Sequence, residues 1–386
     1  MALVQDGRGS PDTTPTAGRG GPFLALLRRL KLLRDDRHHR ELPFVALVAF
    51  TWLPIIALAA ASHQARQILS NFSIHARLLV SLPLLYEADV VLSELVGITL
   101  ACFARARVAQ GLDPGSLDDV QRRAERLRSS SAGEAACLML ALVVGPLAFW
   151  GGAGGPAGIA ALDANARSPA LLWYGWVSLP TFSFLLFRGL WRWLLWAWTL
   201  WRISRLDLRL VPTHPDSSGG LGVLAIPNRG FSLFVAAVAA GVAGVWGSKI
   251  IFHRARLPSF GPPAAMLLAI SLLVGLGPLL VFSRKLLGAK VAGRARYGSL
   301  ASDYTTQFDE RWIVHSQREG LLGTADLQSL ADLANSYSIV RKMRLVPFDR
   351  VDVVVLVASV LVPLSPLVLT EIPLKSLLKM LADAVL

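Results

Sequence analysis

The sequence is poor in charged residues. Only 17% of its 386 residues are Asp, Glu, Lys or Arg, whereas roughly 25% is usual for a soluble globular domain. The two cysteines, Cys102 and Cys137, are too few for a disulfide framework and lack the paired spacing of a zinc site. H-E-x-x-H and G-x-S-x-G motifs, internal repeats, heptad arrays and β-rich segments are also missing. These absences exclude an ordinary soluble protein and indicate neither a cofactor nor a metal ligand set.

Apolar residues and basic residues are both plentiful. Hydrophobic residues make up 53% of the chain, the mean hydropathy is +0.50, and Lys and Arg exceed Asp and Glu by 13 charges. The two facts are compatible if the apolar residues lie in lipid and the basic ones gather in loops on one side of the membrane. The composition therefore predicts a polytopic membrane protein.

Seven segments are long and apolar enough to cross a bilayer as helices, which takes about 20 residues for a hydrocarbon layer of ~30 Å. The fold class is therefore all-α, a transmembrane helical bundle of about seven spans. The predicted spans are residues 43–62, 79–103, 135–153, 171–201, 231–248, 264–282 and 351–369.

The distribution of Lys and Arg predicts the orientation of these spans. Alternate connecting segments, beginning with residues 1–42, hold 29 basic residues, whereas the opposite set holds 8. Basic residues are enriched in cytoplasmic loops. We therefore expect the N-terminus and residues 283–350 on the cytosolic side of the membrane.

The chain divides into five parts. Residues 1–22 read as a disordered cytosolic tail without a signal peptide, and residues 23–42 as an amphipathic interfacial helix and linker. Residues 43–282 form the first six spans. Residues 283–350 form a cytosolic helical hairpin, in which Tyr297, Leu300, Tyr304, Phe308 and Trp312 recur at helical steps. Residues 351–386 form the seventh span and a C-terminal amphipathic segment.

Three stretches carry a resemblance to a known group. They are residues 212–222 (PTHPDSSGGLG), residues 297–300 (YGSL) with Phe308 and Trp312 downstream, and residues 322–333 through 343–348 (MRLVPF). Across residues 200–370 the chain resembles a group of bacterial multispanning inner-membrane proteins to which no activity is assigned. The resemblance implies a bacterial inner-membrane origin and nothing about mechanism.

The second predicted span contains three carboxylates, Glu87, Asp89 and Glu94. An ionised carboxylate within the hydrocarbon costs at least a few kcal/mol, so each must be protonated, paired or hydrated. Glu87 and Glu94 are seven residues apart and share a helix face, whereas Asp89 points elsewhere. The carboxylates belong either to a cation or proton pathway or to structural salt bridges.

Arg188 and Arg192 of the fourth span are the expected partners of Glu87 and Glu94, because they are four residues apart on one helix face. Their depth depends on where the helix begins. If it begins near Leu171, which we prefer, Arg188 lies close to the cytosolic headgroups and extends toward them. If it begins at Pro180, both arginines lie near the middle of the membrane and need a carboxylate.

Tryptophans of the same span are expected to form interfacial belts, the ordinary use of this residue in membranes. A cage for a cationic ligand is the alternative. The residues are Trp173, Trp176, Trp191, Trp193, Trp196, Trp198 and Trp201.

The loop of residues 212–222 is the second candidate site. Backbone amides around Gly219, Gly220 and Gly222 could bind an anion, and His214 with Asp216 could supply two metal ligands or a proton relay. The loop lacks the Walker and dinucleotide-binding patterns, so a rigid turn between spans is the favoured interpretation.

Two function classes follow, with an enzyme as a third. The first is an ion channel or a proton- or ion-coupled transporter with the second-span carboxylates in its pathway. The second is a membrane scaffold or signalling component that recruits a partner through its basic cytosolic face. A membrane-embedded enzyme would depend on His214 and Asp216. Anionic lipids are the expected partners, a second copy of the chain is an alternative, and nucleic acid is not expected.

Overall fold

The computed structural model describes residues 41–62, 68–106, 108, 115–150, 168–314 and 325–370, together with Arg29. Its regular elements within these ranges are all helical, which confirms the all-α prediction there. The predicted tail of residues 1–22, almost all of the 23–42 segment and the C-terminal amphipathic segment lie outside the described residues.

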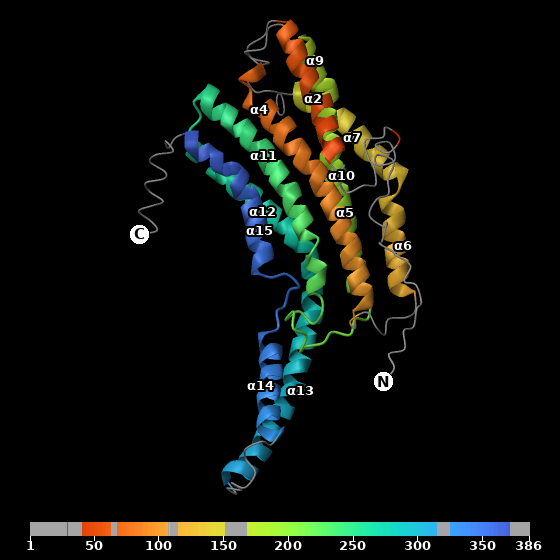
Figure 1. Ribbon diagram of the computed structural model, residues 1–386, viewed down its shortest axis with the longest axis vertical. Helices are drawn as coiled ribbons and strands as arrows, with labels where there is room; N and C mark the ends of the chain where they lie inside the picture. Colours follow the sequence, from red (N-terminus) through yellow and green to blue (C-terminus); the bar gives the residue numbers. More distant parts are fainter. Residues whose placement is uncertain are drawn as a thin grey trace, which may run out of the picture.

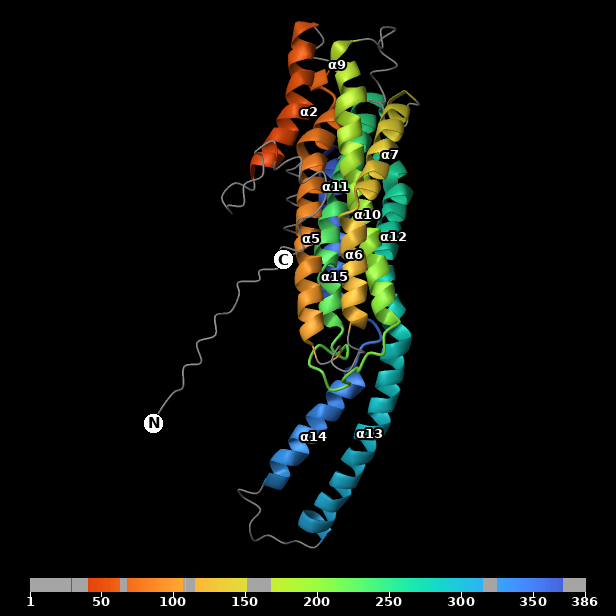
Figure 2. The ribbon, with the colours of Figure 1, turned by 90° about the vertical axis from the view of Figure 1, so that its right-hand side faces the viewer.

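Most of the helices form an elongated bundle, and one pair projects from its end (Figures 1 and 2). The helices are α2 (Glu41–Ala61), α4 (Phe72–His75), α5 (Leu82–Arg105), α6 (Ser116–Arg128), α7 (Ser131–Trp150), α9 (Pro169–Trp173), α10 (Leu179–Ser204), α11 (Asn228–His253), α12 (Gly261–Leu276), α13 (Ser283–Asp309), α14 (Ala325–Lys342) and α15 (Arg350–Leu364). Shorter π-helical turns are η3 (Ala76–Ser81), η4 (Tyr174–Ser178) and η8 (Glu310–Val314), and shorter 3₁₀ turns are η5 (Gly222–Ala225), η6 (Leu257–Phe260), η7 (Gly277–Phe282) and η9 (Ser365–Thr370).

Five continuous helical stretches in the described chain are long and apolar enough to cross a membrane: Pro43–Ala61, Pro169–Ser204, Gly222–Phe252, Leu257–Val314 and Arg350–Thr370. A sixth forms if α6 and α7, which meet at 42°, act as one bent span. The predicted count of about seven is therefore not confirmed. The second predicted span corresponds to α5, which is not among these candidates. Helix α5 is long enough to cross a membrane, but it carries the charged residues Glu87, Asp89, Glu94 and Arg105.

Helices α5, α10 and α11 form the centre of the bundle. Helix α10 packs against α5, α6 and α7, while α11 packs against α5 and α15. At their meeting point the ring of Trp193 stacks on Phe231 with centroids 4.1 Å apart, and the Trp193 indole N–H donates to the carbonyl of Val274 at 2.9 Å. This packing fits the side chains closely together where α10, α11 and α12 meet.

Large hydrophobic side chains also cover much of the outside of the bundle. Exposed examples lie on α7, α12 and α15, where Met139, Leu147, Leu273, Val354 and Val362 each expose more than 60% of their surface. Helices that are apolar on the outside as well as the inside are typical of membrane spans. The outer surface therefore supports the membrane interpretation independently of helix length.

Helix α10 continues from α9 without a break at Pro180. Because proline has no backbone N–H, Pro180 cannot donate a hydrogen bond to the carbonyl one turn earlier in the helix. The π-helical turn η4, which is wider than an α-helical turn, lies just before it. The same arrangement places η3 before Pro83 of α5. The fourth predicted span therefore begins at Pro169, near the Leu171 start that we preferred.

The segment between the second and third predicted spans, which we expected to be a loop, contains the helix α6. This helix packs along α10 and buries Leu117 and Val120.

Helices α13 and α14 lie side by side and extend beyond the bundle (Figure 2). Tyr304 of α13 donates to the backbone of Asp326 at 3.0 Å, and Trp312 of η8 donates to its carboxylate at 3.3 Å, so these two aromatic residues join the two arms of the hairpin.

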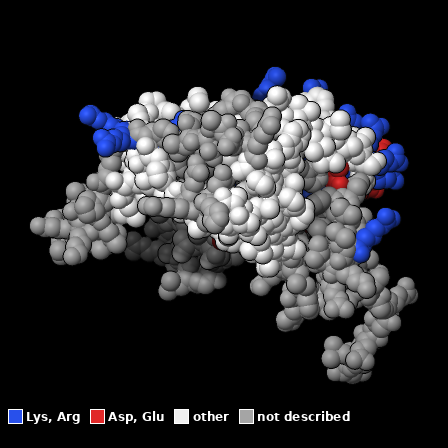
Figure 3. All heavy atoms as spheres, turned by 90° about the horizontal axis from the view of Figure 1, so that it is seen from above, with Lys and Arg blue, Asp and Glu red and all other residues white. Residues whose placement is uncertain are grey.

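The opposite end of the bundle is shown in Figure 3. Lysines and arginines lie near the edges of this view, and most of the described surface between them is uncharged. The basic residues of the described chain are therefore not spread evenly over this end.

Candidate functional site

The centre of the bundle holds a cluster of four buried charged side chains, which we call the charge cluster: Asp89 of α5, Glu134 of α7, and Arg188 and Arg192 of α10. Their exposed fractions are 2%, 7%, 1% and 7%. Asp89 forms an ion pair with Arg188 and a second with Arg192, whose Nη1 lies 2.9 Å from Oδ1. The Nε of Arg188 also lies 3.1 Å from Oε1 of Glu134. The four formal charges sum to zero.

Spacing on α10 builds this arrangement. Arg188 and Arg192 are four residues apart, so their side chains leave the same face of the helix. Asp89 lies between them on the facing side of α5, and Ser93, one turn further along α5, accepts a hydrogen bond from Arg192. Each guanidinium therefore meets oxygen atoms rather than apolar side chains, as buried charges require.

The structure corrects the predicted partners of the arginines. Glu87 and Glu94 do share a face of α5, but that face is exposed on the outside of the bundle. Asp89 is two residues from Glu87, about 200° around the helix, and this places it on the inward face. The acid that was expected to point elsewhere is thus the one that meets Arg188 and Arg192.

The depth of Arg188 in the membrane stays a prediction, but its surroundings are known. The helix begins near Leu171, as preferred, and Asp89 and Glu134 hold the Arg188 side chain inside the bundle. Two carboxylates within reach compensate the positive charge of the Arg188 guanidinium better than partial hydration of that group would. The helix start therefore did not determine where the side chain lies.

Glu134 was missed by the sequence interpretation, which assigned it to a basic loop one residue before the third span. Its signal was weak but present: a single carboxylate at the very start of an apolar run. In the structure Glu134 lies in the first turn of α7, where its negative charge interacts favourably with the helix dipole.

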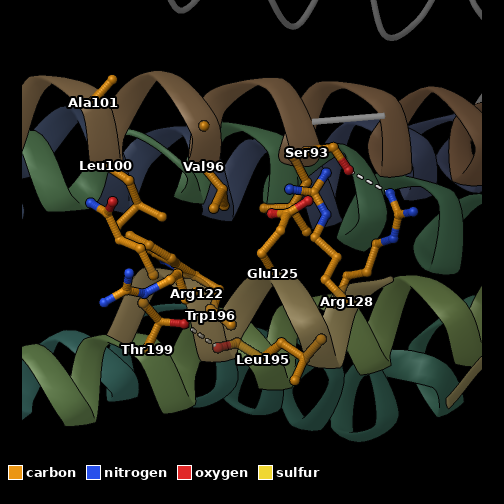
Figure 4. A pocket seen from close by; sticks show the side chains of 15 residues that line it. Ser93, Val96, Leu100, Ala101, Arg122, Glu125, Arg128, Leu195, Trp196 and Thr199 are labelled. Carbon is orange, nitrogen blue, oxygen red and sulfur yellow. Dashed lines mark hydrogen bonds between the residues drawn. The ribbon is translucent and has the colours of Figure 1, made fainter. Parts of the chain in front are cut away.

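A cavity of about 330 Å³ lies next to the charge cluster, between α5, α6 and α10. Figure 4 shows side chains from all three helices converging on it. Leu92, Val96, Leu100 and Leu195 contribute apolar walls, and Arg122, Glu125, Arg128, Arg192, Trp196 and Thr199 contribute polar atoms. Arg192 thus belongs both to the charge cluster and to the cavity.

The second candidate site, residues 212–222, is occupied by one of its own side chains. The carboxylate of Asp216 accepts hydrogen bonds from the amides of Ser218 at 2.8 Å, Gly220 at 3.1 Å and Gly222 at 2.9 Å. His214 Nδ1 lies 2.8 Å from the same carboxylate. The amides that could have bound a foreign anion therefore already bind Asp216.

Electrostatics agree with this arrangement. Burial by itself raises the pKa of Asp216, but the hydrogen bonds from the Ser218, Gly222 and Gly220 amides and from His214 outweigh it, so the pKa lies below its ordinary value. The carboxylate is thus ionised at neutral pH and acts as the internal anion of the loop.

Positive backbone φ angles explain two of the three glycines. Gly219 has φ +64° and Gly220 has φ +93°, a region that other residues rarely adopt. A Cβ on Gly220 would also lie 2.3 Å from Val108. Arg344 joins the loop to the end of the hairpin through the carbonyl of Asp216 at 2.8 Å. These contacts favour the rigid-turn interpretation over an anion or metal site.

Metal binding finds no support in the described ranges, where no group of three or more His, Cys, Asp or Glu side chains could hold an ion. His214 and Asp216 provide only two such groups. Cys102 is exposed and Cys137 is buried, and both are free thiols. That neither takes part in a metal site stays a prediction.

The tryptophans of α9 and α10 do not all form belts. Trp193 and Trp196 are fully buried in the bundle core, with exposed fractions of 1% and 2%, which contradicts their predicted place at the interface. Trp176 and Trp201 are exposed, and their place in an interfacial belt stays a prediction. The difference follows from the helix face, since Trp193 and Trp196 lie on the side of Arg192.

Comparisons with known proteins add no identification. No family model, curated protein or solved structure matches the chain. The functional argument therefore depends on the charge cluster and the cavity.

Proposed function

We propose that this protein is an integral membrane transport protein, either a proton- or ion-coupled transporter or an ion channel, in which the charge cluster belongs to the pathway or coupling site. The observation that carries the proposal is the burial of Asp89, Glu134, Arg188 and Arg192 inside a bundle of which five helices are apolar enough to cross a membrane. Charged side chains in such surroundings are expensive and usually serve transport or proton relay.

Stability alone is a poor reason for such a cluster. Replacing a buried ion pair by well-packed apolar residues is often neutral or stabilising, because desolvation offsets the attraction. Competing pairs give the cluster a means to respond to a proton or ion. Asp89 contacts two arginines and Arg188 contacts two carboxylates. Protonating Asp89 would therefore leave Arg188 paired with Glu134 and Arg192 with the hydroxyl of Ser93.

The proposal also includes the orientation of the bundle in the membrane and the assignment of α5 as a further span. We place α5 across the membrane as well, because it packs between the candidate spans α10 and α11, and this would bring the total to seven. The bias of basic residues supports a cytosolic N-terminus and a cytosolic hairpin. The resemblance noted above supports a bacterial inner membrane, where anionic lipids would be the neighbouring partners.

Flux through reconstituted protein tests the role of the cluster. Asp89→Asn leaves two arginines without their shared partner and should cost roughly 3–5 kcal/mol. The double variant Asp89→Asn/Arg192→Gln restores charge balance and should fold better than the single variant. We expect both to lose proton, Na⁺, K⁺ or Cl⁻ flux measured in proteoliposomes with ion-sensitive dyes.

Asp303→Asn is the matched control, because Asp303 is exposed on α13, far from the cluster. If the cluster is only structural, the double variant will recover wild-type flux along with its fold. Flux of none of these ions through the wild-type protein would contradict the proposal. Glu87→Gln/Glu94→Gln tests separately whether the outward-facing acids, still predicted pathway residues, contribute.

A scaffold that recruits a partner is the second candidate, and one observation favours it. The hairpin of α13 and α14 projects from the bundle and exposes Leu300, Ile313, Val314 and Leu327. In that case Leu300→Asp/Leu327→Asp would abolish co-purification of a partner while leaving the bundle folded, and proteoliposomes would show no flux. The enzyme hypothesis depended on His214 and Asp216, which take part in the fold of their own loop.

A further inference from the structure

The cavity between α5, α6 and α10 has features of a binding site that the proposed transport function does not require. We propose that it binds an amphiphilic anion, a carboxylate or phosphate attached to an apolar body. The inference goes beyond transport, since the site could equally serve a permanently bound ligand or a regulator.

Two buried hydrogen-bond donors of the cavity wall have no acceptor. The Trp196 indole Nε1 and the Arg192 Nη2 have no hydrogen-bond partner within the described structure, although their side chains are more than nine-tenths buried. Both residues line the cavity and lie four apart on α10, so they share a face. A buried donor left without an acceptor costs about 1–3 kcal/mol. Both donor atoms lie within the wall itself, so a ligand oxygen would accept from them, and remove this cost, once their side chains turn toward the cavity.

Charge of the lining selects the sign of the ligand. Arg122, Arg128 and Arg192 line the cavity, against the single carboxylate of Glu125. Arg122 has an exposed partner, Asp119 at 2.7 Å, on the solvent side of α6, and Asp89 lies behind Arg192 in the charge cluster. Neither of these acids lines the cavity, so the formal charge of its mostly apolar lining is positive. An anion fits this surface, whereas a cation would meet only Glu125.

The rest of the wall selects an apolar body. Leu92, Val96, Leu100 and Leu195 line the space beside these donors, and the ring of Trp196 forms part of the same wall. The cavity volume of about 330 Å³ is at the lower end of the range for small-molecule sites, about 300–1,000 Å³. One short chain or a small ring system would therefore fill it.

Gly97 offers a direct way to test occupancy. It lines the cavity, and a Cβ placed on it would have no neighbour within 4 Å. Gly97→Leu should therefore fill the space without forcing the backbone apart. Gly288→Leu is the matched control, because Gly288 on α13 is equally uncrowded and does not line the cavity.

Equilibrium binding of radiolabelled decanoate to the full chain, in nanodiscs of phosphatidylcholine and with empty nanodiscs subtracted, is the primary measurement. We expect saturable binding to the wild type and to Gly288→Leu, and none to Gly97→Leu. Trp196→Phe removes one donor and should weaken binding roughly 2- to 10-fold, whereas Trp198→Phe, outside the lining, should not. Decyltrimethylammonium, a cation of equal chain length, should not compete.

A second arm distinguishes a lipid from a soluble anion. If an anionic lipid fills the site, nanodiscs containing phosphatidylglycerol should suppress decanoate binding, and native mass spectrometry should find phosphatidylglycerol retained by the wild type but not by Gly97→Leu. If the ligand is soluble, phosphatidylglycerol should have no effect. Equal binding by Gly97→Leu and Gly288→Leu would overturn the proposal, as would neither decanoate nor phosphatidylglycerol binding, or competition by the cation. Decanoate binding without ion flux would support the site while contradicting transport.

Discussion

At the scale of single residues, Asp216 determines the conformation of a whole loop. Its carboxylate accepts hydrogen bonds from three backbone amides and lies next to His214. Its backbone carbonyl accepts a hydrogen bond from Arg344, which follows α14. The Asp216 side chain thus organises its own loop, and its backbone carbonyl connects the loop to Arg344, just after α14. The loop is rigid because an internal anion satisfies amides that would otherwise face one another unpaired.

We predict that Asp216→Asn destabilises the protein at neutral pH by roughly 1–3 kcal/mol, because the amides lose a charged acceptor. The lowered pKa of Asp216 means that its stabilisation is fully present above the unfolded-state value, about 3.9, and is lost as the pH falls through the folded-state value. The difference between wild type and variant should therefore shrink in acid.

Thermal unfolding in detergent between pH 7 and pH 3, followed by scanning fluorimetry, measures this difference. Asp303→Asn, an exposed carboxylate of α13, should show no comparable effect at any pH. A wild-type advantage over Asp216→Asn that stays constant into strong acid would contradict the assigned role.

At the scale of elements, the glycines of α11 set how closely the helices approach. The sequence places Gly241, Gly244 and Gly247 on one ridge. In the structure a Cβ on Gly244 would lie 2.4 Å from the Cβ of Ala76, and one on Gly241 would lie 3.1 Å from Ser81. The ridge thus packs within the subunit, against η3, as small residues allow in membrane helices.

Gly244→Ala should therefore destabilise the bundle by roughly 1–3 kcal/mol, the usual cost of forcing an extra methyl group into a packed interface. Gly288→Ala makes the same chemical change where no atom lies within 4 Å, and it should instead stabilise by up to about 1 kcal/mol through helix propensity. Urea or thermal unfolding of the two variants measures the sign. Equal effects would mean that the close approach of α11 to η3 contributes nothing.

At the scale of the whole molecule, the hairpin and the α11–η6 connection lie at opposite ends of the bundle (Figure 1). Single cysteines at Ser302 and Ser259, both exposed, therefore report on two sides of the membrane once Cys102 and Cys137 are replaced. In intact bacterial cells a membrane-impermeant maleimide should label Ser259→Cys only. Ser302→Cys should react only after permeabilisation, because the proposed orientation places the basic hairpin on the cytosolic side.

Labelling of both positions in intact cells would contradict a membrane between them, and the reverse pattern would contradict the proposed orientation. The two cysteine positions are controls for each other, because each has an exposed serine as its parent residue. The result is independent of whether the protein transports an ion.

Much of the fold could be predicted from the sequence. Five of the seven predicted spans coincide, within a residue at their ends, with or lie inside helices that meet the criteria for crossing a membrane, and the described part of the third overlaps α7 of the bent α6–α7 pair. The second corresponds to α5, whose charges set it apart. Apolar runs are a local property of the chain, so their positions do not depend on how the helices pack.

The candidate site was only partly predictable. The sequence identified Asp89, Arg188 and Arg192 as unusual, and it gave the correct faces of α5, with Asp89 separated from Glu87 and Glu94. It paired the wrong acids with the arginines, and it missed Glu134 and the cavity. Periodicity determines which residues share a face, but it contains no information about which face turns toward the neighbouring helix.

The sequence by itself determined that this chain is helical, apolar and biased in charge, because these properties follow from composition and spacing along the chain. Only the tertiary structure decided that Asp89 and Glu134 meet Arg188, since these partners are 99 and 54 residues away from it. The same packing of α5, α6 and α10 created a cavity with unpaired donors. Such contacts depend on the rotation of each helix about its axis, which is fixed by the fit of side chains between helices.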